Sequence, residues 1–163
     1  MAKMKIIFDG FTDLADEIEK AGKNLKPAVD EALTETQRII QRATTQAASV
    51  YAQKGGGRKG YATGKIYRAI LQNPSPEWSG TVASVEVGFD LKKPGGNHSI
   101  FVMYGTKSHP VRNQYGTPRK AGARNTQTTK DTMLFDAIFG TKIRKDVAEA
   151  QEEIMRKYLT IGG

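Results

Sequence analysis

The chain has 163 residues, 38% of them hydrophobic and 26% charged, with no cysteine and a formal net charge of +8. These values fit a single domain, 1–163, and they exclude a disulfide framework and a thiolate zinc site. No apolar run approaches the ~20 residues of a membrane-spanning helix, and the apolar stretch near the N-terminus is too short for a secretory signal. We therefore expect a soluble protein without a membrane partner.

The positive charge is concentrated in the middle of the chain. Residues 1–53 carry a net charge of −1, residues 54–130 carry +10 and residues 131–163 carry −1. Such a region attracts phosphate or an acidic protein surface over a Debye length of about 8 Å. A solvated, solubilising surface is the alternative that charge alone leaves open.

The first third of the chain predicts one strand and two helices. Lys3–Asp9 has the alternation of a strand, and residues 11–25 have apolar positions at helical spacing. Pro27 suits the first turn of a second, long helix over residues 28–52. We expect its polar side, Asp30, Glu31, Glu35, Gln37, Arg38 and Gln41, to face away from its apolar stripe, Val29, Ala32, Leu33, Ile39, Ile40, Ala43, Ala47, Val50 and Tyr51.

The middle of the chain predicts a loop, a short helix and a pair of strands. Residues 53–63 form a flexible, basic, glycine-rich loop, and Thr63 is placed to cap a short helix. Pro74, Pro76 and Gly80 interrupt the chain. Thr81–Phe89 then alternates cleanly, with Ala83, Val85, Val87 and Phe89 on one face. The evenly apolar run Ser99–Tyr104 predicts a more central strand, antiparallel to the first.

Residues 107–130 form a long basic loop within the domain, with six Lys/Arg and no acidic residue. A loop of about two dozen residues in a compact domain is usually functional or disordered. A short apolar helix over 133–139 follows, and Thr141 is placed to cap a final amphipathic helix. We expect an α+β fold: a small antiparallel sheet packed against a long amphipathic helix and a C-terminal helix, with long basic loops.

The pattern gives little support for catalysis. The two histidines, His98 and His109, lie in polar segments at no recognised ligand spacing, and no phosphate-binding motif is present. We therefore expect no enzymatic activity, no catalytic or metal-binding residue and no cofactor. A hydrolase that uses a loop histidine is the least favoured alternative.

Basic residues in the two loops are the candidate interface. Tyr61, Tyr67 and Tyr115 are interleaved with them and are able to stack on bases, so sequence-independent nucleic-acid binding is an alternative function. No helix-turn-helix, ribonucleoprotein or zinc-finger signature accompanies them. The candidate interface residues are Lys54, Arg58 and Lys59 in the first loop, and Lys107, Arg112, Arg119, Lys120 and Arg124 in the second.

Two short motifs, in their order along the chain, are similar to those of a known protein family. The first is Ala62–Ile70 (ATGKIYRAI), and the second is Phe101–Thr106 (FVMYGT), with a strand ending in Val87-Gly88 between them. Over residues 28–159 the chain resembles the neck or tail-completion (head–tail joining) family of long-tailed double-stranded DNA bacteriophages. It departs from that family at Met103, where an acidic residue is common, and in the greater length of 107–130.

The resemblance implies a structural virion protein at the head–tail junction, assembled in the host cytoplasm. It would act by ring-like homo-oligomerisation and by docking its loops onto other phage neck and tail proteins, and nonspecific contact with channel DNA stays open. Thr63, Gly64 and Gly105 would set the backbone turns that aim the loops. Segments that become ordered only against a partner suit such assembly.

Overall fold

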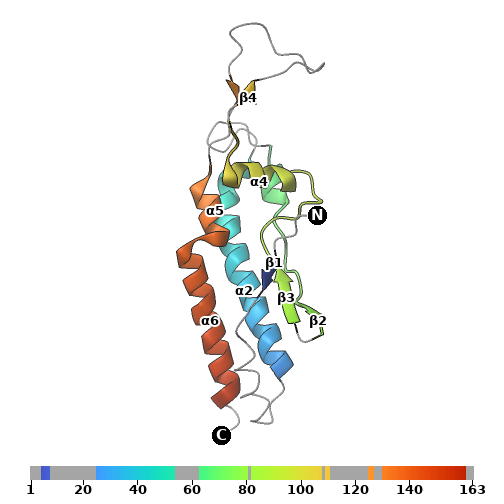
Figure 1. The fold of residues 1–163 in the computed structure, drawn as a ribbon, viewed down its shortest axis with the longest axis vertical. Helices are drawn as coiled ribbons and strands as arrows, with labels where there is room; N and C mark the ends of the chain where they lie inside the picture. The colour runs from blue at the N-terminus through green and yellow to red at the C-terminus, as the bar shows by residue number, and fades with distance from the viewer. Residues whose placement is uncertain are drawn as a thin grey trace.

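The computed structural model describes residues 5–7, 25–53, 63–80, 82–107, 109–110, 125–126 and 130–160. Two long helices, α2 (Leu25–Ala48) and α6 (Thr141–Thr160), lie side by side, and a small sheet lies on the other side of α2 (Figure 1). The predicted α+β fold, with an antiparallel sheet beside a long amphipathic helix and a C-terminal helix, is confirmed.

The sheet has three antiparallel strands in the order β1-β3-β2. The central strand β3 (Val82–Glu86) pairs with β1 (Lys5–Ile7) on one side and with β2 (Glu77–Ser79) on the other. Of the four residues predicted to share one face of this segment, Val85, Val87 and Phe89 are buried and Ala83 is half-buried. The strand β2 was not predicted, since the prolines and glycine around it indicated only a break.

The predicted strand Ser99–Tyr104 is wrong, because this run belongs to the helix α4 (Gly96–Tyr104). The buried positions Gly96, Ser99 and Met103 follow helical spacing, whereas a strand would bury alternate residues. The predicted pairing of this run with β3 is therefore also wrong. A short, evenly apolar run does not separate helix from strand by periodicity, and the positions that the tertiary packing buries decide the outcome.

The apolar stripe of α2 is largely buried, with two exceptions to the prediction. Gln37 is buried although it was expected to face away, and it donates a hydrogen bond to Gln41 one turn along the helix. Val50 lies in the 3-10 helix η1 (Ser49–Tyr51), where the tighter turn leaves it 53% exposed. The neighbouring Tyr51 is buried as expected.

Two predicted helix caps are wrong. The short helix α3 (Lys65–Arg68) begins after Gly64, which occupies the cap position without a side-chain hydrogen bond, so the Thr63 hydroxyl does not cap it. At the start of α6, the amide of Arg144 donates to the carbonyl of Gly140 at 3.1 Å. Thr141 is therefore the first helical residue, and Gly140 both ends α5 (Thr132–Phe139) and precedes α6.

The main core lies where α2, β3, α4, α5 and the start of α6 meet. Its largest fully buried side chains include Ile40, Ile70, Val85, Met103 and Leu134. A smaller cluster at the far end joins α2 to α6 and consists of Ala28, Ala32 and Met155. The helix predicted over residues 11–25 lies outside the described residues except for Leu25, which begins α2.

Candidate functional site

One end of the molecule carries α4 and the two ends of the long basic segment 107–130, which we call the cationic segment (Figure 1). The chain leaves through β4 (His109–Pro110) and returns through β5 (Asn125–Thr126), and these two strands pair antiparallel. Beyond the helices, this pair projects from the body as a stalk (Figure 1). Residues 111–124, which the sequence places between the two strands, lie outside the described residues.

Most of the predicted interface residues lie outside the described residues. Lys107 is described, and its exposed side chain stands at the base of the stalk. The other predicted residues of this segment fall in the sequence between β4 and β5, outside the described residues: Arg112, Arg119, Lys120 and Arg124. The predicted residues of the glycine-rich loop, Lys54, Arg58 and Lys59, fall between two described residues at the same end, Gln53 and Thr63.

The glycine-rich loop returns to the body at Gly64, which has a positive φ of 75°. An added Cβ there would lie 2.6 Å from Arg68 Nη1 and 2.9 Å from the carbonyl oxygen of Ala52. Glycine is therefore required both for the backbone conformation and for the approach of the two loop ends. Arg68 Nη2 also donates to the carbonyl of Thr63 at 3.2 Å, which ties the turn to α3.

Gly105 ends α4 with φ 74° and turns the chain toward Lys107 and the stalk. The return of the chain is fixed by Asp131, which is buried just after Lys130. Its carboxylate accepts hydrogen bonds from the Tyr51 hydroxyl and from the Leu134 amide, and the latter caps α5. Its own amide donates to the carbonyl of Val102 at 2.8 Å. The base of the cationic segment is thus anchored to η1, α4 and α5.

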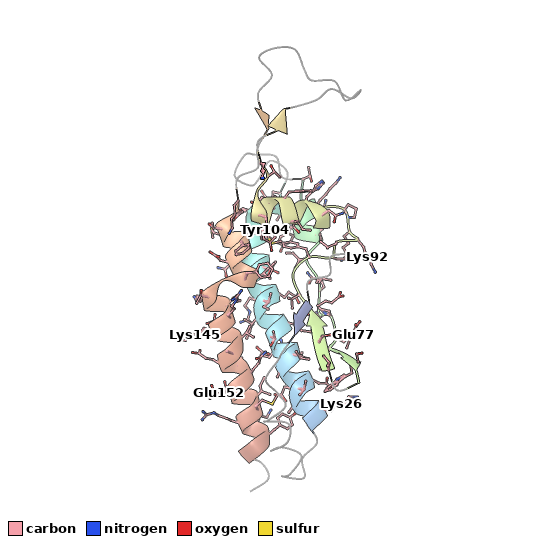
Figure 2. All side chains as sticks on the ribbon, in the orientation of Figure 1. Lys26, Glu77, Lys92, Tyr104, Lys145 and Glu152 are labelled. Carbon is pink, nitrogen blue, oxygen red and sulfur yellow. The ribbon has the colours of Figure 1, made fainter. Side chains whose placement is uncertain are left out.

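Large apolar side chains are exposed at the same end, and sequence reasoning missed them as a surface. Phe101 and Tyr104 on α4 are 52% and 56% exposed, and Met133 on α5 is 69% exposed. Figure 2 shows Tyr104 where α4 meets α5 and Lys92 beyond the other end of α4. The sequence signal that could have revealed this surface is the helical spacing within residues 96–104, with Gly95 and Gly105 as the boundaries of the helix.

The other end of α2 and α6 offers a groove of a different kind. It is lined by Asp30, Glu31, Glu35, Arg38 and the α6 residues Ala150, Glu153 and Ile154. Its carboxylates on α2 have internal partners: Trp78 Nε1 donates to Asp30 at 2.8 Å, and Arg38 pairs with Glu35 at 2.7 Å. These bonds hold neighbouring elements together, so we assign the groove a structural role.

Among the groove carboxylates, Glu31 accepts hydrogen bonds from two side chains. Lys157 Nζ and the Tyr158 hydroxyl each donate to it at 2.9 Å. The hydrogen bond from Lys157, followed by that from Tyr158, lowers the pKa of Glu31, and the same carboxylate raises the pKa of Lys157. The three groups tie the end of α6 to α2: Glu31 and Lys157 each stabilise the charged form of the other, and the neutral Tyr158 hydroxyl stabilises the Glu31 carboxylate.

Within the residues that the structure describes, no group of three His, Asp or Glu side chains is arranged to hold a metal ion. His98 lies on the exposed side of α4. Among the same residues, no helix is both long and apolar enough to cross a bilayer. Comparisons with known protein families, with curated proteins and with solved structures gave no match to this chain.

Proposed function

We propose that this protein is a structural component of a phage virion at the head–tail junction. It forms a ring-like homo-oligomer and docks its loops onto adjoining neck and tail proteins. The observation that carries the proposal is the projecting stalk: a segment with six Lys/Arg and no acidic residue leaves and re-enters the body through paired strands. A segment with this charge is suited to an acidic or phosphate-bearing neighbour.

The two motifs of the resemblance lie at this end of the molecule. The first supplies the tight turn at Gly64 and the short basic helix α3. The second differs from the family pattern, because Tyr104-Gly105-Thr106 ends a helix rather than a strand. It still directs the chain from a packed element into the stalk. Both motifs therefore support a role in aiming loops.

The proposal is tested by shortening the cationic segment while keeping the stalk. Replacing residues 111–124 with Asn-Gly joins Pro110 to Asn125 through a two-residue hairpin turn. We expect an unchanged thermal melt, since the main core is built from α2, β3, α4, α5 and α6. In a host that produces the phage, we expect full heads beside unattached tails by electron microscopy.

A matched variant separates charge from length. It keeps all residues of the segment but changes Arg112, Arg119, Lys120 and Arg124 to Gln. We expect it to lose head–tail joining as well, because the contact depends on charge. Normal particles from both variants would contradict docking by the segment. A chain that stays monomeric in mass photometry with its neighbouring virion proteins would contradict the ring.

Sequence-independent nucleic-acid binding is the second candidate. It is favoured by the same cationic segment and by Tyr115 within it, because an aromatic ring among cations can stack on a base. Micromolar or tighter binding of the lone chain to a random-sequence oligonucleotide, lost steeply with added salt, would favour this function. Under the virion proposal, we expect weak binding that the Gln variant abolishes without a change in fold.

A further inference from the structure

We propose that Phe101, Tyr104 and Met133, which we call the aromatic face, form a docking surface for an acidic protein segment with apolar side chains. The inference rests on the proposed function only where it identifies that partner as another virion protein. The three side chains come from two elements that pack together, and each is more than half exposed. Clustered large apolar side chains on a surface mark interaction sites more often than scattered ones do.

The side chains of the aromatic face lie on α4 and α5, two helices that pack against each other. Phe101 and Tyr104 lie one turn apart on the outer side of α4, opposite the buried Ser99 and Met103. The backbone of Asp131 bonds to Val102, and the ring of Phe135 meets Tyr104 edge-on with centroids 5.4 Å apart. Met133 lies between Asp131 and Phe135 in sequence, in the first turn of α5. The three exposed side chains therefore share one end of the molecule.

The platform beneath these side chains is rigid. Gly95, before α4, has φ 101°, and an added Cβ would lie 2.5 Å from the Lys65 carbonyl carbon, so α4 begins in tight contact with α3. Met103 is fully buried beneath the helix. Anchors that are already fixed in position lose little conformational entropy on binding, and aromatic residues and methionine are enriched at interface centres.

The charge around the aromatic face selects the partner. The described residues from Leu91 to Lys130 include four lysines, Lys92, Lys93, Lys107 and Lys130, and no Asp or Glu. Lys107 and Lys130 flank the base of the stalk beside the face, and Lys130 Nζ lies 3.7 Å from the Phe135 ring centroid. Asp131, the next acidic residue, is buried and bonded to Tyr51 and Leu134, whereas Asp136, one turn beyond Met133 on α5, is exposed, so the lysines outnumber the exposed carboxylates here. An acidic partner is attracted to this rim.

The same charge argues against two other occupants. Two copies that met through this face in a symmetric dimer would bring like charges together, which is unfavourable. Duplex DNA would satisfy the lysines, but its phosphate backbone has no apolar surface that would cover Phe101 and Met133. A protein segment that combines carboxylates with apolar side chains can pair with the lysines and also cover the exposed apolar side chains.

A pair of designed helical peptides tests this chemistry on the full chain without a virion. Both carry the same leucine stripe; one is flanked by Glu and its twin by Lys. In fluorescence anisotropy we expect at least tenfold tighter binding of the Glu peptide, with a preference that weakens as salt is added. Equal affinity for the two peptides, or binding of neither, would overturn the proposal.

Matched variants localise the binding. Phe101→Ser is expected to weaken the Glu peptide about tenfold, a change of 1.4 kcal/mol. Val82→Ser is the control, because Val82 is a similarly exposed apolar residue, 46% exposed, on β3. A thermal melt confirms that both variants fold. The same loss of binding in both variants would refute the assignment to the aromatic face.

Cross-linking in assembled particles separates this inference from the proposed function. With a photoreactive phenylalanine at position 101, we expect a covalent product with a different virion polypeptide, at a segment that contains Asp or Glu. A product of twice this chain's mass, a nucleic-acid adduct or no product from intact particles would each overturn the docking surface while leaving the head–tail role standing. Absence of the protein from particles would instead overturn the proposed function.

Discussion

The two ends of this molecule are both built from amphipathic helices, but they differ in whether their surface side chains have partners within the chain. At the end formed by the start of α2 and the end of α6, the α2 carboxylates Asp30, Glu31 and Glu35 are bonded within the chain, as with Glu31, Lys157 and Tyr158. At the end formed by α4 and the stalk, large apolar side chains are exposed beside a region without acidic residues. The first end is complete by itself, whereas the second has the chemistry of a surface made for a partner.

This contrast teaches that the exposed apolar surface and the main core lie at the same end of the long axis. The main core lies beneath α4, so the exposed aromatic face rests on the larger of the two clusters of buried apolar residues. A rigid support lets a surface keep exposed apolar anchors without collapsing onto them. The comparison can be sharpened with like-for-like substitutions at the two ends.

The largest effect is expected from Met103→Ala, compared with Met155→Ala. Met103 is fully buried in the main core, while Met155 packs mainly against Ala28 and Ala32 in the smaller cluster. We expect Met103→Ala to lower the free energy of unfolding by about 3–5 kcal/mol and Met155→Ala by about 2 kcal/mol. Urea denaturation measures both. A larger loss at Met155 would mean that the main stability lies at the opposite end.

An intermediate effect is expected at Gly64, with Gly80 as its match. Both have positive φ, 75° and 62°, but an added Cβ at Gly80 meets nothing within 4 Å. Gly80→Ala should therefore show backbone strain alone, about 1 kcal/mol. Gly64→Ala adds the clash with Ala52 and Arg68 and should lose roughly 2–4 kcal/mol. Similar thermal melts for the two variants would show that the approach at Gly64 is not tight.

The smallest effect is expected from Glu31→Gln, and it depends on pH. Since the folded-state pKa of Glu31 is lowered, its contribution to stability is present above the ordinary value of 4.5 and is lost as pH falls through the folded pKa. Urea denaturation of the wild type and the variant should therefore differ at pH 7 and converge in acid. The raised pKa of Lys157 predicts a second loss when pH rises above 10.5. A constant difference across the acid range would contradict the ion pair.

A large part of the fold could be predicted from the sequence, because its helices are amphipathic over many turns. The stripes of α2 and α6, and the buried face of Val85, Val87 and Phe89, follow from periodicity alone. The cationic segment was equally visible, since net charge per segment needs no structure. These features are properties of the chain itself and do not depend on which elements meet.

Tertiary structure decided the character of Ser99–Tyr104. This evenly apolar run fits a buried strand or a helix equally well, and packing against α3 and α5 selects a helix that buries Met103 and exposes Phe101. It also decided which acidic residue is buried, since Asp131 is held by Tyr51 from 80 positions away. Charge and periodicity are written along the chain, but burial depends on contacts between distant segments, and those contacts exist only in the folded protein.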